Sequence, residues 1–356
     1  DWERLIPMIG RSNRALARYE GILTALPNPA LLLSALTTRE AVLSSRIEGT
    51  RATMGDVLKF EAGDSPEQES RVLDIQEIQN YRTTLQKAER ELAKKPFGLN
   101  LLRDLHANLM DSVRGRTRAP GEFRRTQNWV GPPGSTIETA AYVPPSPDRL
   151  MGYLDNWERY YHADQPDPLV QLALLNAQFE LIHPFLDGNG RLGRLIIPLY
   201  LHEKQLLSRP MFYLSDWLER HRDAYYDHLQ ALSVRTGAWN DWIVFFLQGV
   251  EEQALANVKT ASSILALYEK LKVRIIEVSH SQWSVPLLDA MFRRPVFTSS
   301  TLNLKRPSPT RPSLANLLRA LRADGILKVV AEGSGRRATV YVLAELVNLS
   351  EGRKVF

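Results

Sequence analysis

The sequence predicts an all-α helical bundle that carries one β-hairpin flap, followed by a C-terminal winged helix-turn-helix module. Apolar residues recur at helical spacing in three N-terminal segments, which are 30–49, 65–94 and 98–110. A segment rich in Pro, Gly and Arg, 114–136, interrupts this helical pattern. Residues 326–343, ILKVVAEGSGRRATVYVL, are typical of two strands joined by a Gly-rich turn. A helix-turn-helix pattern before such a strand pair indicates a winged helix.

Each element of the bundle has its own local signal. The helix in 30–49 is expected to end at Gly49, a C-cap residue. A short β-hairpin or extended flap is expected at 127–143, and a helix at 147–162. Residues 169–182 are apolar on most sides and predict a buried central helix, which ends before Pro184 because proline disfavours helix at the preceding residue. Further helices are expected at 191–207, 216–232 and 239–278, the last of them broken or kinked.

Length and composition predict a globular protein of three domains. At 356 residues, with 44% apolar and 24% charged residues, the chain divides into an N-terminal helical region (1–95), a central domain (96–265) and the winged-helix module (266–356). The chain contains no cysteine, which excludes disulfides, thiolate zinc sites and cysteine nucleophiles. No apolar run approaches the ~20 residues that span a bilayer, and no signal peptide is visible. We therefore expect a cytoplasmic protein without a membrane partner.

Twelve residues, 183–194, combine the parts of a phosphate-transfer site in the stretch HPFLDGNGRLGR. A Gly-rich loop that opens a helix exposes backbone N–H groups, which bind phosphate oxygens. Asp187 is a hard oxygen ligand suited to Mg²⁺, and His183 can take a proton from an attacking hydroxyl. Arg191 and Arg194 lie three positions apart and can neutralise further phosphates. The alternative is an ordinary turn with surface arginines; it suits DGNG alone better than the whole stretch.

This stretch also resembles the signature of the Fic family, HPFx[DE]GNGRxxR, at every specified position. The resemblance implies that 96–265 is a Fic domain, and that the protein is a protein adenylyltransferase that moves AMP from ATP to a Ser, Thr or Tyr hydroxyl of a target protein or of itself. It makes His183 the catalytic base and Asp187 the Mg²⁺ ligand. It further implies that nucleotide phosphates bind to Gly188, Asn189, Gly190, Arg191 and Arg194. Phe185 is expected to pack into the core and fix the loop.

A second stretch, Ser44 to Gly49, matches the inhibitory pattern [ST]xxxE[GN] of many Fic relatives. The resemblance implies that Glu48 pairs with Arg194 and removes the charge that should hold the γ-phosphate. Taken alone, Ser44 and Glu48 on one helix face are better explained as an ordinary capped helix. Some family members use the same glutamate to remove AMP, so this second activity is open. A homodimer would be one way to hold the inhibitory helix.

Aromatic residues after the signature provide a candidate for adenine binding. In Fic relatives an aromatic side chain on a later helix contacts the base, and here Tyr225 and Tyr226 fall on such a helix. Tyr226 is the better candidate, although simple packing of the pair explains them as well. The asparagine expected seven positions later is Ser233 in this chain.

The C-terminal quarter supports a different function, DNA binding. Residues 268–356 contain 15 Lys and Arg against 7 Asp and Glu. In this reading 308–322 holds the recognition helix, and Arg336 and Arg337 lie at the tip of the wing near phosphates. The protein would then be a transcriptional regulator with the Fic domain as a nucleotide sensor. Winged helices also bind proteins or pack within larger chains, so the DNA partner stays an alternative.

Overall fold

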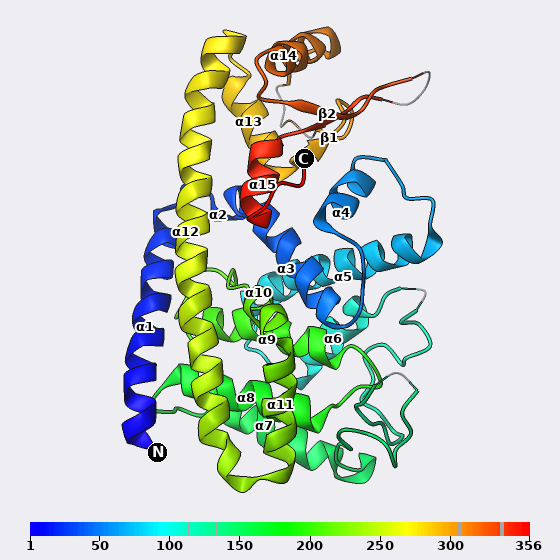
Figure 1. The fold of residues 1–356 in the computed structure, drawn as a ribbon, viewed down its shortest axis with the longest axis vertical. Helices are drawn as coiled ribbons and strands as arrows, with labels where there is room; N and C mark the ends of the chain where they lie inside the picture. The colour runs from blue at the N-terminus through cyan, green and yellow to red at the C-terminus, as the bar shows by residue number, and fades with distance from the viewer. Residues whose placement is uncertain (113, 133, 303, 305–307, 335–337) are drawn as a thin grey trace. The chain divides into compact units, whose positions relative to one another are not determined.

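The computed structural model describes residues 1–112, 114–132, 134–302, 304, 308–334 and 338–356. The protein is mostly helical, with 65% helix and 3% strand, which confirms the predicted predominance of helices. The chain forms two compact units: unit 1 comprises 1–21, 43–50 and 76–257, and unit 2 comprises 22–42, 51–75 and 258–356. Four helices begin in one unit and end in the other (Figure 1): α1 (Trp2–Ala25), α3 (Ser34–Ile47), α5 (Glu69–Leu92) and α12 (Trp239–Ser279). The three-domain division stays a prediction.

Unit 1 is organised around a central buried helix, α8 (Pro168–Ile182). Its other elements are α6 (Leu99–Leu109), the 3₁₀ helices η1 (Pro147–Arg149) and η2 (Thr236–Ala238), α7 (Leu150–His162), α9 (Asn189–Glu203), α10 (Ser215–Arg220) and α11 (Arg222–Val234). Helices α7 and α9 pack against α8. Two buried tryptophans donate hydrogen bonds to α8 carbonyls, Trp157 to Leu175 (2.9 Å) and Trp242 to Ala173 (2.7 Å). The prediction of a buried central helix is confirmed.

The ends of α8 follow from its sequence. Asp167 accepts a hydrogen bond from the backbone N–H of Val170 (2.9 Å), and Pro168 occupies the first turn, where its missing N–H costs nothing. At the other end the helix stops at Ile182, one residue before the His183-Pro184 pair, as predicted. The local sequence therefore determines where the central helix ends and the loop at 183–188 begins.

Two of the predicted helices differ in their continuity. The expected break in 239–278 was wrong, because α12 runs as one helix from Trp239 to Ser279 (Figure 1). This helix contains no proline, and a Cβ added to its glycine at 249 would lie 2.7 Å from the ring of Trp217. The expected helix at 216–232 is instead divided at His221 into α10 and α11.

Gly249 is a position where an added methyl group is expected to destabilise the fold. A Cβ there would lie 2.7 Å from a ring carbon of Trp217, whose side chain is fully buried. Gly249→Ala should lower the free energy of unfolding by about 1–3 kcal/mol, because the ring has no room to move. Gly152→Ala on α7 is the matched control: its Cβ meets open space, so helix propensity should stabilise it by roughly 0.5–1 kcal/mol. Thermal melts of both variants check the pair; equal midpoints would contradict it.

The flap has less regular structure than a full hairpin. Within 127–143, apart from residue 133, one antiparallel bridge joins Val130 to Tyr142, with hydrogen bonds of 2.8 and 3.0 Å in the two directions. No strand is assigned in that described part of the segment. Pro132 and the Pro144-Pro145 pair lack backbone N–H donors, which limits the ladder to a single bridge. The segment is thus the extended flap, one of the two predicted forms.

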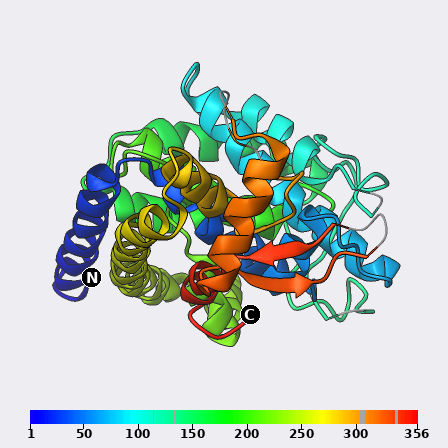
Figure 2. The same ribbon diagram turned by 90° about the horizontal axis from the view of Figure 1, so that it is seen from above.

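Unit 2 contains the small antiparallel sheet. Its elements include α2 (Pro29–Leu32), α4 (Met54–Glu61), α13 (Ser284–Arg293), β1 (Val296–Phe297), α14 (Arg311–Ala323), β2 (Lys328–Ala331), β3 (Val340–Val342) and α15 (Ala344–Glu351). The strand order is β1-β3-β2, and both pairings are antiparallel (Figure 2). Strands β2 and β3 confirm the strand pair predicted for 326–343. Arg336 and Arg337, assigned to the tip of the wing, lie outside the described residues.

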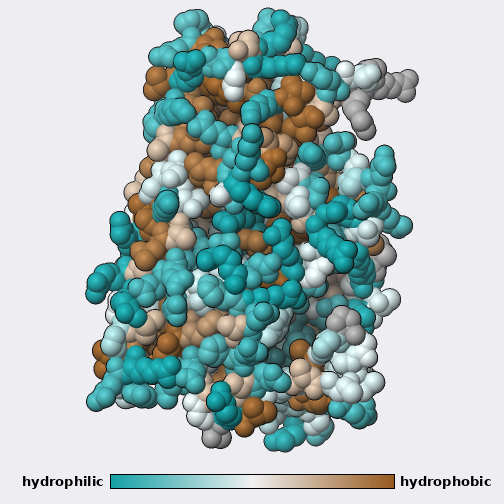
Figure 3. Space-filling view, viewed as in Figure 1, coloured by the Kyte–Doolittle hydropathy of each residue, from teal (hydrophilic) through white to brown (hydrophobic). Residues whose placement is uncertain are grey.

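Among the described residues, no helix is both long enough and apolar enough to cross a bilayer. On the face drawn in Figure 3, hydrophobic residues are interspersed with hydrophilic ones.

Candidate active site

The loop between α8 and α9 places His183 in an unusual backbone conformation. His183 has φ 48° and ψ 60°, the left-handed region that residues with a Cβ seldom adopt. This conformation turns the chain at the end of α8, and the loop then enters α9 through Gly188, which also has a positive φ of 79°. Gly188 has no Cβ to strain; an added one would lie 2.7 Å from Met110 Sδ.

The imidazole of His183 is arranged as a proton acceptor. Its Nδ1 lies 3.2 Å from the carbonyl oxygen of Glu180. A carbonyl only accepts hydrogen bonds, so Nδ1 carries the proton and Nε2 keeps its lone pair. Burial lowers the pKa of His183, because desolvation disfavours the imidazolium. The ring is therefore neutral near pH 7, as a general base requires.

The middle of the loop is braced by Phe185 and Asn189. Phe185 is fully buried, as predicted, and stacks on His106 with ring centroids 3.7 Å apart. Asn189 accepts a hydrogen bond from the Phe185 N–H (2.9 Å) and donates one to the Phe185 carbonyl (2.8 Å). The side chain of Asn189 thus stabilises the loop. Only the backbone N–H of Asn189 is then available to bind a phosphate.

His106, on α6, is a residue that the sequence analysis missed. The Gly121 N–H donates to its Nδ1 (2.9 Å), so Nε2 carries the proton and donates to the Asp187 carbonyl (3.0 Å). Burial lowers the pKa of His106 to about 4, which keeps the ring neutral. The signal was a histidine among leucines on the apolar side of a predicted helix.

Arg194 is held by the N-terminal segment at 43–50, which contains Glu48, the partner that the family resemblance implied for it. The Arg194 side chain is 1% exposed and donates from Nη2 to Glu48 Oε1 (2.6 Å). It also donates from Nε to Ser44 Oγ (2.9 Å) and from Nη2 to the Ser44 carbonyl (2.8 Å). The Glu48 side chain is 34% exposed, so the pair is buried only on its arginine side.

The charges of this pair reinforce each other. Burial opposes ionisation of Glu48, but the attraction of Arg194 outweighs it and lowers the pKa of the carboxyl. Burial likewise disfavours the charged guanidinium, yet Glu48 raises the pKa of Arg194. The carboxylate also lies at the start of α9, where a Cβ added to Gly190 would collide with Glu48 Oε1. Glu48 therefore sits at the end of a helix that attracts anions.

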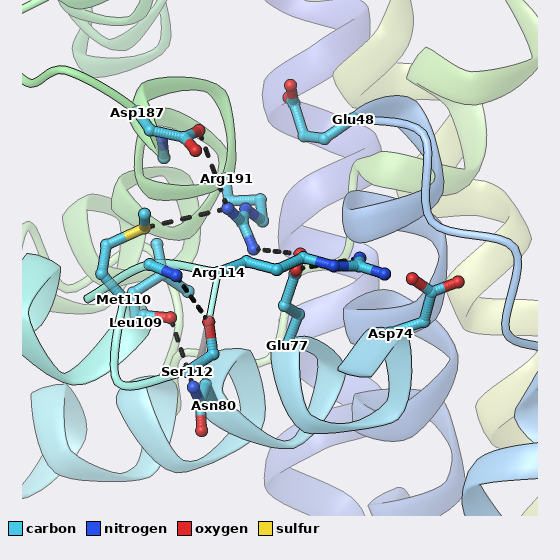
Figure 4. Close-up of polar contacts among 12 residues, drawn as sticks. Glu48, Asp74, Glu77, Asn80, Leu109, Met110, Ser112, Arg114, Asp187 and Arg191 are labelled. Atoms are coloured by element: carbon cyan, nitrogen blue, oxygen red, sulfur yellow. Dashed lines mark hydrogen bonds and ion pairs between the residues drawn. The ribbon is translucent and has the colours of Figure 1, made fainter. Parts of the chain in front are cut away.

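Arg191 has different partners from Arg194, although the two residues lie three positions apart on α9. Its Nη1 donates to Glu77 Oε2 on α5 (2.9 Å), and its Nη2 lies 3.8 Å from Met110 Sδ and 3.9 Å from Asp187 Oδ1 (Figure 4). Glu77 also pairs with Arg114 at 3.3 Å. The structure thus brings Arg191 beside Asp187 and adds Glu77, for which the sequence offered no signal.

A cavity of about 590 Å³, which is within the usual size of a small-molecule site, adjoins Glu48, His183 and Arg194. Its lining residues come from α8, α9, α11, the flap and the N-terminal segment: Ile47, Glu48, Val130, Gly131, Pro132, Ala141, Tyr142, Glu180, Leu181, His183, Gly190, Arg194, Arg222, Tyr225, Tyr226, Leu229 and Gln230. Tyr225 is buried, whereas Tyr226 is 38% exposed and stacks near the Arg222 guanidinium, 5.8 Å from its ring centroid. The geometry favours Tyr226 over Tyr225 as the accessible aromatic.

Glu180 is an additional acid in this lining. Burial raises its pKa to about 7, and its Oε1 has no hydrogen-bond partner among the described residues. Because the pKa in the folded state is above its ordinary value, the protonated form favours folding. That stability is present at pH 4 and is lost as the pH rises through 7.

Glu180→Gln should therefore stabilise the protein at pH 8 and have little effect at pH 4. The expected gain at pH 8 is roughly 3 kcal/mol at most, since one pKa unit corresponds to about 1.4 kcal/mol. Urea unfolding of both proteins at several pH values measures the difference. Parallel stability curves for wild type and variant would contradict the raised pKa.

Comparison with known families agrees with this geometry. Residues 6–90 match the family model described as Fic/DOC family N-terminal, and residues 96–201 match the model described as Fic/DOC family. The two matches together cover more than half of the chain. The chain belongs to the Fic/DOC family. The Fic match contains the whole loop from His183 to Arg194, and the N-terminal match contains Ser44, Glu48 and Glu77.

Relatives of this Fic protein include named enzymes and solved structures. It is 33% identical over 135 residues to "Protein adenylyltransferase Fic" of Culex quinquefasciatus; the match covers 36% of this chain and 23% of that relative. It therefore spans about a quarter of the relative's length. A Fic family protein from Desulfovibrio desulfuricans G20 has a similar fold, with a TM-score of 0.58, 18% identity and 95% coverage of both chains. A Fic domain containing signaling protein from Bacteroides thetaiotaomicron has a TM-score of 0.56 at 19% identity. The match covers 71% of this chain and 96% of that chain.

Proposed function

We propose that this protein is a protein adenylyltransferase, which transfers AMP from ATP to a Ser, Thr or Tyr hydroxyl of a target protein or of itself. The observation that carries the proposal is that His183, the start of α9 and Arg194 border one cavity. A general base, an anion-binding helix end and a fixed cation are the groups this displacement needs. The adenylyltransferase name of the Culex relative supports the same activity.

The reaction exchanges a phosphoanhydride bond of ATP for a phosphoester bond to the target hydroxyl. The target hydroxyl oxygen attacks the α-phosphorus of ATP while Nε2 of His183 takes the hydroxyl proton. The bond from the α-phosphorus to the bridging oxygen breaks, and pyrophosphate leaves with that electron pair. Backbone N–H groups of Gly188, Asn189 and Gly190 at the start of α9 bind the phosphate charge. Arg194 would hold the γ-phosphate, once Glu48 has released it.

Asp187 fits the role of a Mg²⁺ ligand that acts together with the nucleotide. No group of three or more His, Asp or Glu side chains that could hold a metal occurs in the described part of the chain. Magnesium commonly needs only one or two protein carboxylates, because phosphates and water complete its shell. The Asp187 carboxylate is half-exposed, so it can meet such a complex. Bound there, Mg²⁺ would offset phosphate charge, and Arg191 would stabilise Asp187 beside it.

The same geometry supports an autoinhibited state. The Glu48 carboxylate pairs with Arg194 and approaches Gly190, so it occupies the place where we expect phosphate oxygens. Two anions cannot share this site, because like charges at close range repel strongly. Ser44 keeps the arginine in the inhibited orientation. Removal of AMP by a water that Glu48 positions is the alternative activity that the same residues would support.

Tyr226 and the flap complete the proposed substrate contacts. The exposed ring of Tyr226 would contact the adenine, and Arg222 lies over the same ring. An extended target segment would pair with the backbone of the flap near Val130 and Tyr142, whose residues line the cavity. A homodimer and a cytoplasmic location remain part of the proposal.

Intact-mass analysis after incubation with MgATP tests the reaction type. ATP labelled on the α-phosphate should leave label on the protein, whereas ATP labelled on the γ-phosphate should not. The Glu48→Gly variant is the protein to use, because it lacks the inhibitory carboxylate. Label from the γ-phosphate would instead indicate a kinase, and no label from either would contradict the proposed function.

A second candidate function, DNA binding, is favoured by the order of elements in the C-terminal part. Helix α14 precedes the antiparallel strands β2 and β3, and β1 completes the sheet, as in a winged helix. Several cations in this part are paired, among them Arg274 with Asp324 and Arg322 with Glu332. A gel shift of labelled duplex by the full chain should weaken with added salt; no shift at low salt would exclude this function.

A further inference from the structure

Arg124 lies at the root of the flap and binds the end of α8. The side chain is 3% exposed, yet it is not paired with any carboxylate among the described residues. Instead its Nε donates to the carbonyl oxygen of His183 (2.9 Å), and its Nη2 lies 3.4 Å from the carbonyl of Ile182. The backbone N–H of Arg124 donates to the Pro184 carbonyl (2.9 Å). Arg124 therefore contacts three successive backbone carbonyls, those of the residue before His183, of His183 itself and of the residue after it.

The same residue joins both ends of the flap. Arg124 Nη2 also donates to the carbonyl of Pro145, where the flap returns to the bundle. Asn128, four residues later, donates to the Phe185 carbonyl (3.0 Å). Both ends of the flap are thus tied, through Arg124 and Asn128, to the loop that follows α8. A shift of the flap would move the contacts on which the His183 backbone depends.

The conformation of His183 needs such support. A left-handed backbone costs a residue with a Cβ about 1–2 kcal/mol. It persists only where surrounding contacts fix it. A guanidinium at the carboxyl end of α8 is also favoured by the helix dipole, and its fork of donors matches several carbonyls at once. Lysine carries the same charge but lacks this planar fork.

We propose that Arg124 is a positioning residue. It fixes the backbone of His183 and thereby holds the imidazole at a constant position relative to the flap. Arg124 does not contact the nucleotide in this proposal. It therefore affects the turnover rate and which ring nitrogen of His183 carries the proton. The kinetic part of this inference rests on the proposed adenylyltransferase function. The part that concerns the histidine itself does not.

The test compares Arg124→Lys and Arg124→Gln with Arg125→Lys, all in the Glu48→Gly background. Arg125 is the matched control, because its side chain is 86% exposed and it pairs only weakly with Glu122. We expect kcat for AMP transfer to fall by about 10–100-fold in both Arg124 variants, since small misplacements of a catalytic group have effects of this size. The KM for ATP should change by less than about twofold, and the control should keep both constants.

A second measurement does not depend on activity. Nitrogen-15 NMR of the histidine rings reports which nitrogen carries the proton, and the signal of His183 among the seven histidines is found by its absence in His183→Ala. The parent protein should show protonated Nδ1. The Arg124 variants should show a mixture of both ring forms, while Arg125→Lys should not.

The outcomes separate the inference from the function. Unchanged kcat and an unchanged histidine signal in folded Arg124 variants, as judged by their thermal midpoints, would overturn the positioning role. A parallel loss of ATP affinity would also overturn it, because it indicates a general disruption of the site. If the parent protein transfers no AMP, the proposed function fails, and the NMR comparison still decides the role of Arg124.

Discussion

Replacing His183 by alanine in the Glu48→Gly background should lower AMP incorporation by roughly 10²–10⁴-fold. A positioned general base contributes about that much to a proton-transfer step. The Nδ1 proton is directed to the Glu180 carbonyl, so Nε2 is the atom that accepts the hydroxyl proton, and alanine has no replacement for it. Incorporation of label from α-labelled ATP, followed over time, measures the loss.

His280→Ala is the control for the loss of a histidine, because His280 is exposed and lies in unit 2. It should leave incorporation unchanged. Binding of a non-hydrolysable ATP analogue should survive in His183→Ala, which shows that the phosphate site is intact. Near-normal incorporation by His183→Ala would exclude this histidine as the base.

Glu48→Gly should raise AMP incorporation and ATP affinity relative to wild type. The substitution removes a charge-assisted hydrogen bond to Arg194 and the negative charge at Gly190. A hydrogen bond to a charged group contributes about 1.5–3 kcal/mol, so the expected gain is about 10–100-fold. Glu48 follows the last residue of α3, Ile47, and glycine there does not interrupt a helix. Labelled ATP and calorimetric titration with nucleotide measure the two effects.

Two further variants separate charge from shape. Glu48→Gln keeps the length of the side chain but removes its charge, so it should give part of the gain. Ser44→Ala should have a smaller effect, because Arg194 still donates to the Ser44 carbonyl. Equal incorporation by wild type and Glu48→Gly would contradict autoinhibition by this residue.

Local sequence patterns predicted much of the bundle. The cap at Asp167 and the proline at 184 define α8, and the stretch from His183 to Arg194 marks the loop before α9. The form of the flap was harder to predict, because turn residues indicate where the chain reverses direction but not how many backbone hydrogen-bond pairs form. The single Val130–Tyr142 bridge depends on which N–H groups the prolines leave. The close approach of Gly249 on α12 to Trp217 is likewise a tertiary contact that local patterns do not indicate.

The polar partners of the site were mostly beyond prediction. Arg191 pairs with Glu77, 114 residues earlier in the chain. Spacing within a helix gives the direction in which Arg191 leaves α9, but a distant carboxylate decides where its guanidinium ends. Arg124 is a similar case, because its partners are backbone carbonyls, which every sequence has. The pattern of side chains in the sequence therefore cannot predict these contacts to backbone carbonyls.

At position 183, the residue that suits the backbone best differs from the residue that the proposed chemistry needs. For folding alone, glycine or asparagine would suit a left-handed residue better than histidine does. A lineage that no longer used the imidazole would thus drift toward those residues and gain robustness. The left-handed backbone is therefore a conformational cost that the proposed role of the imidazole in proton transfer would offset.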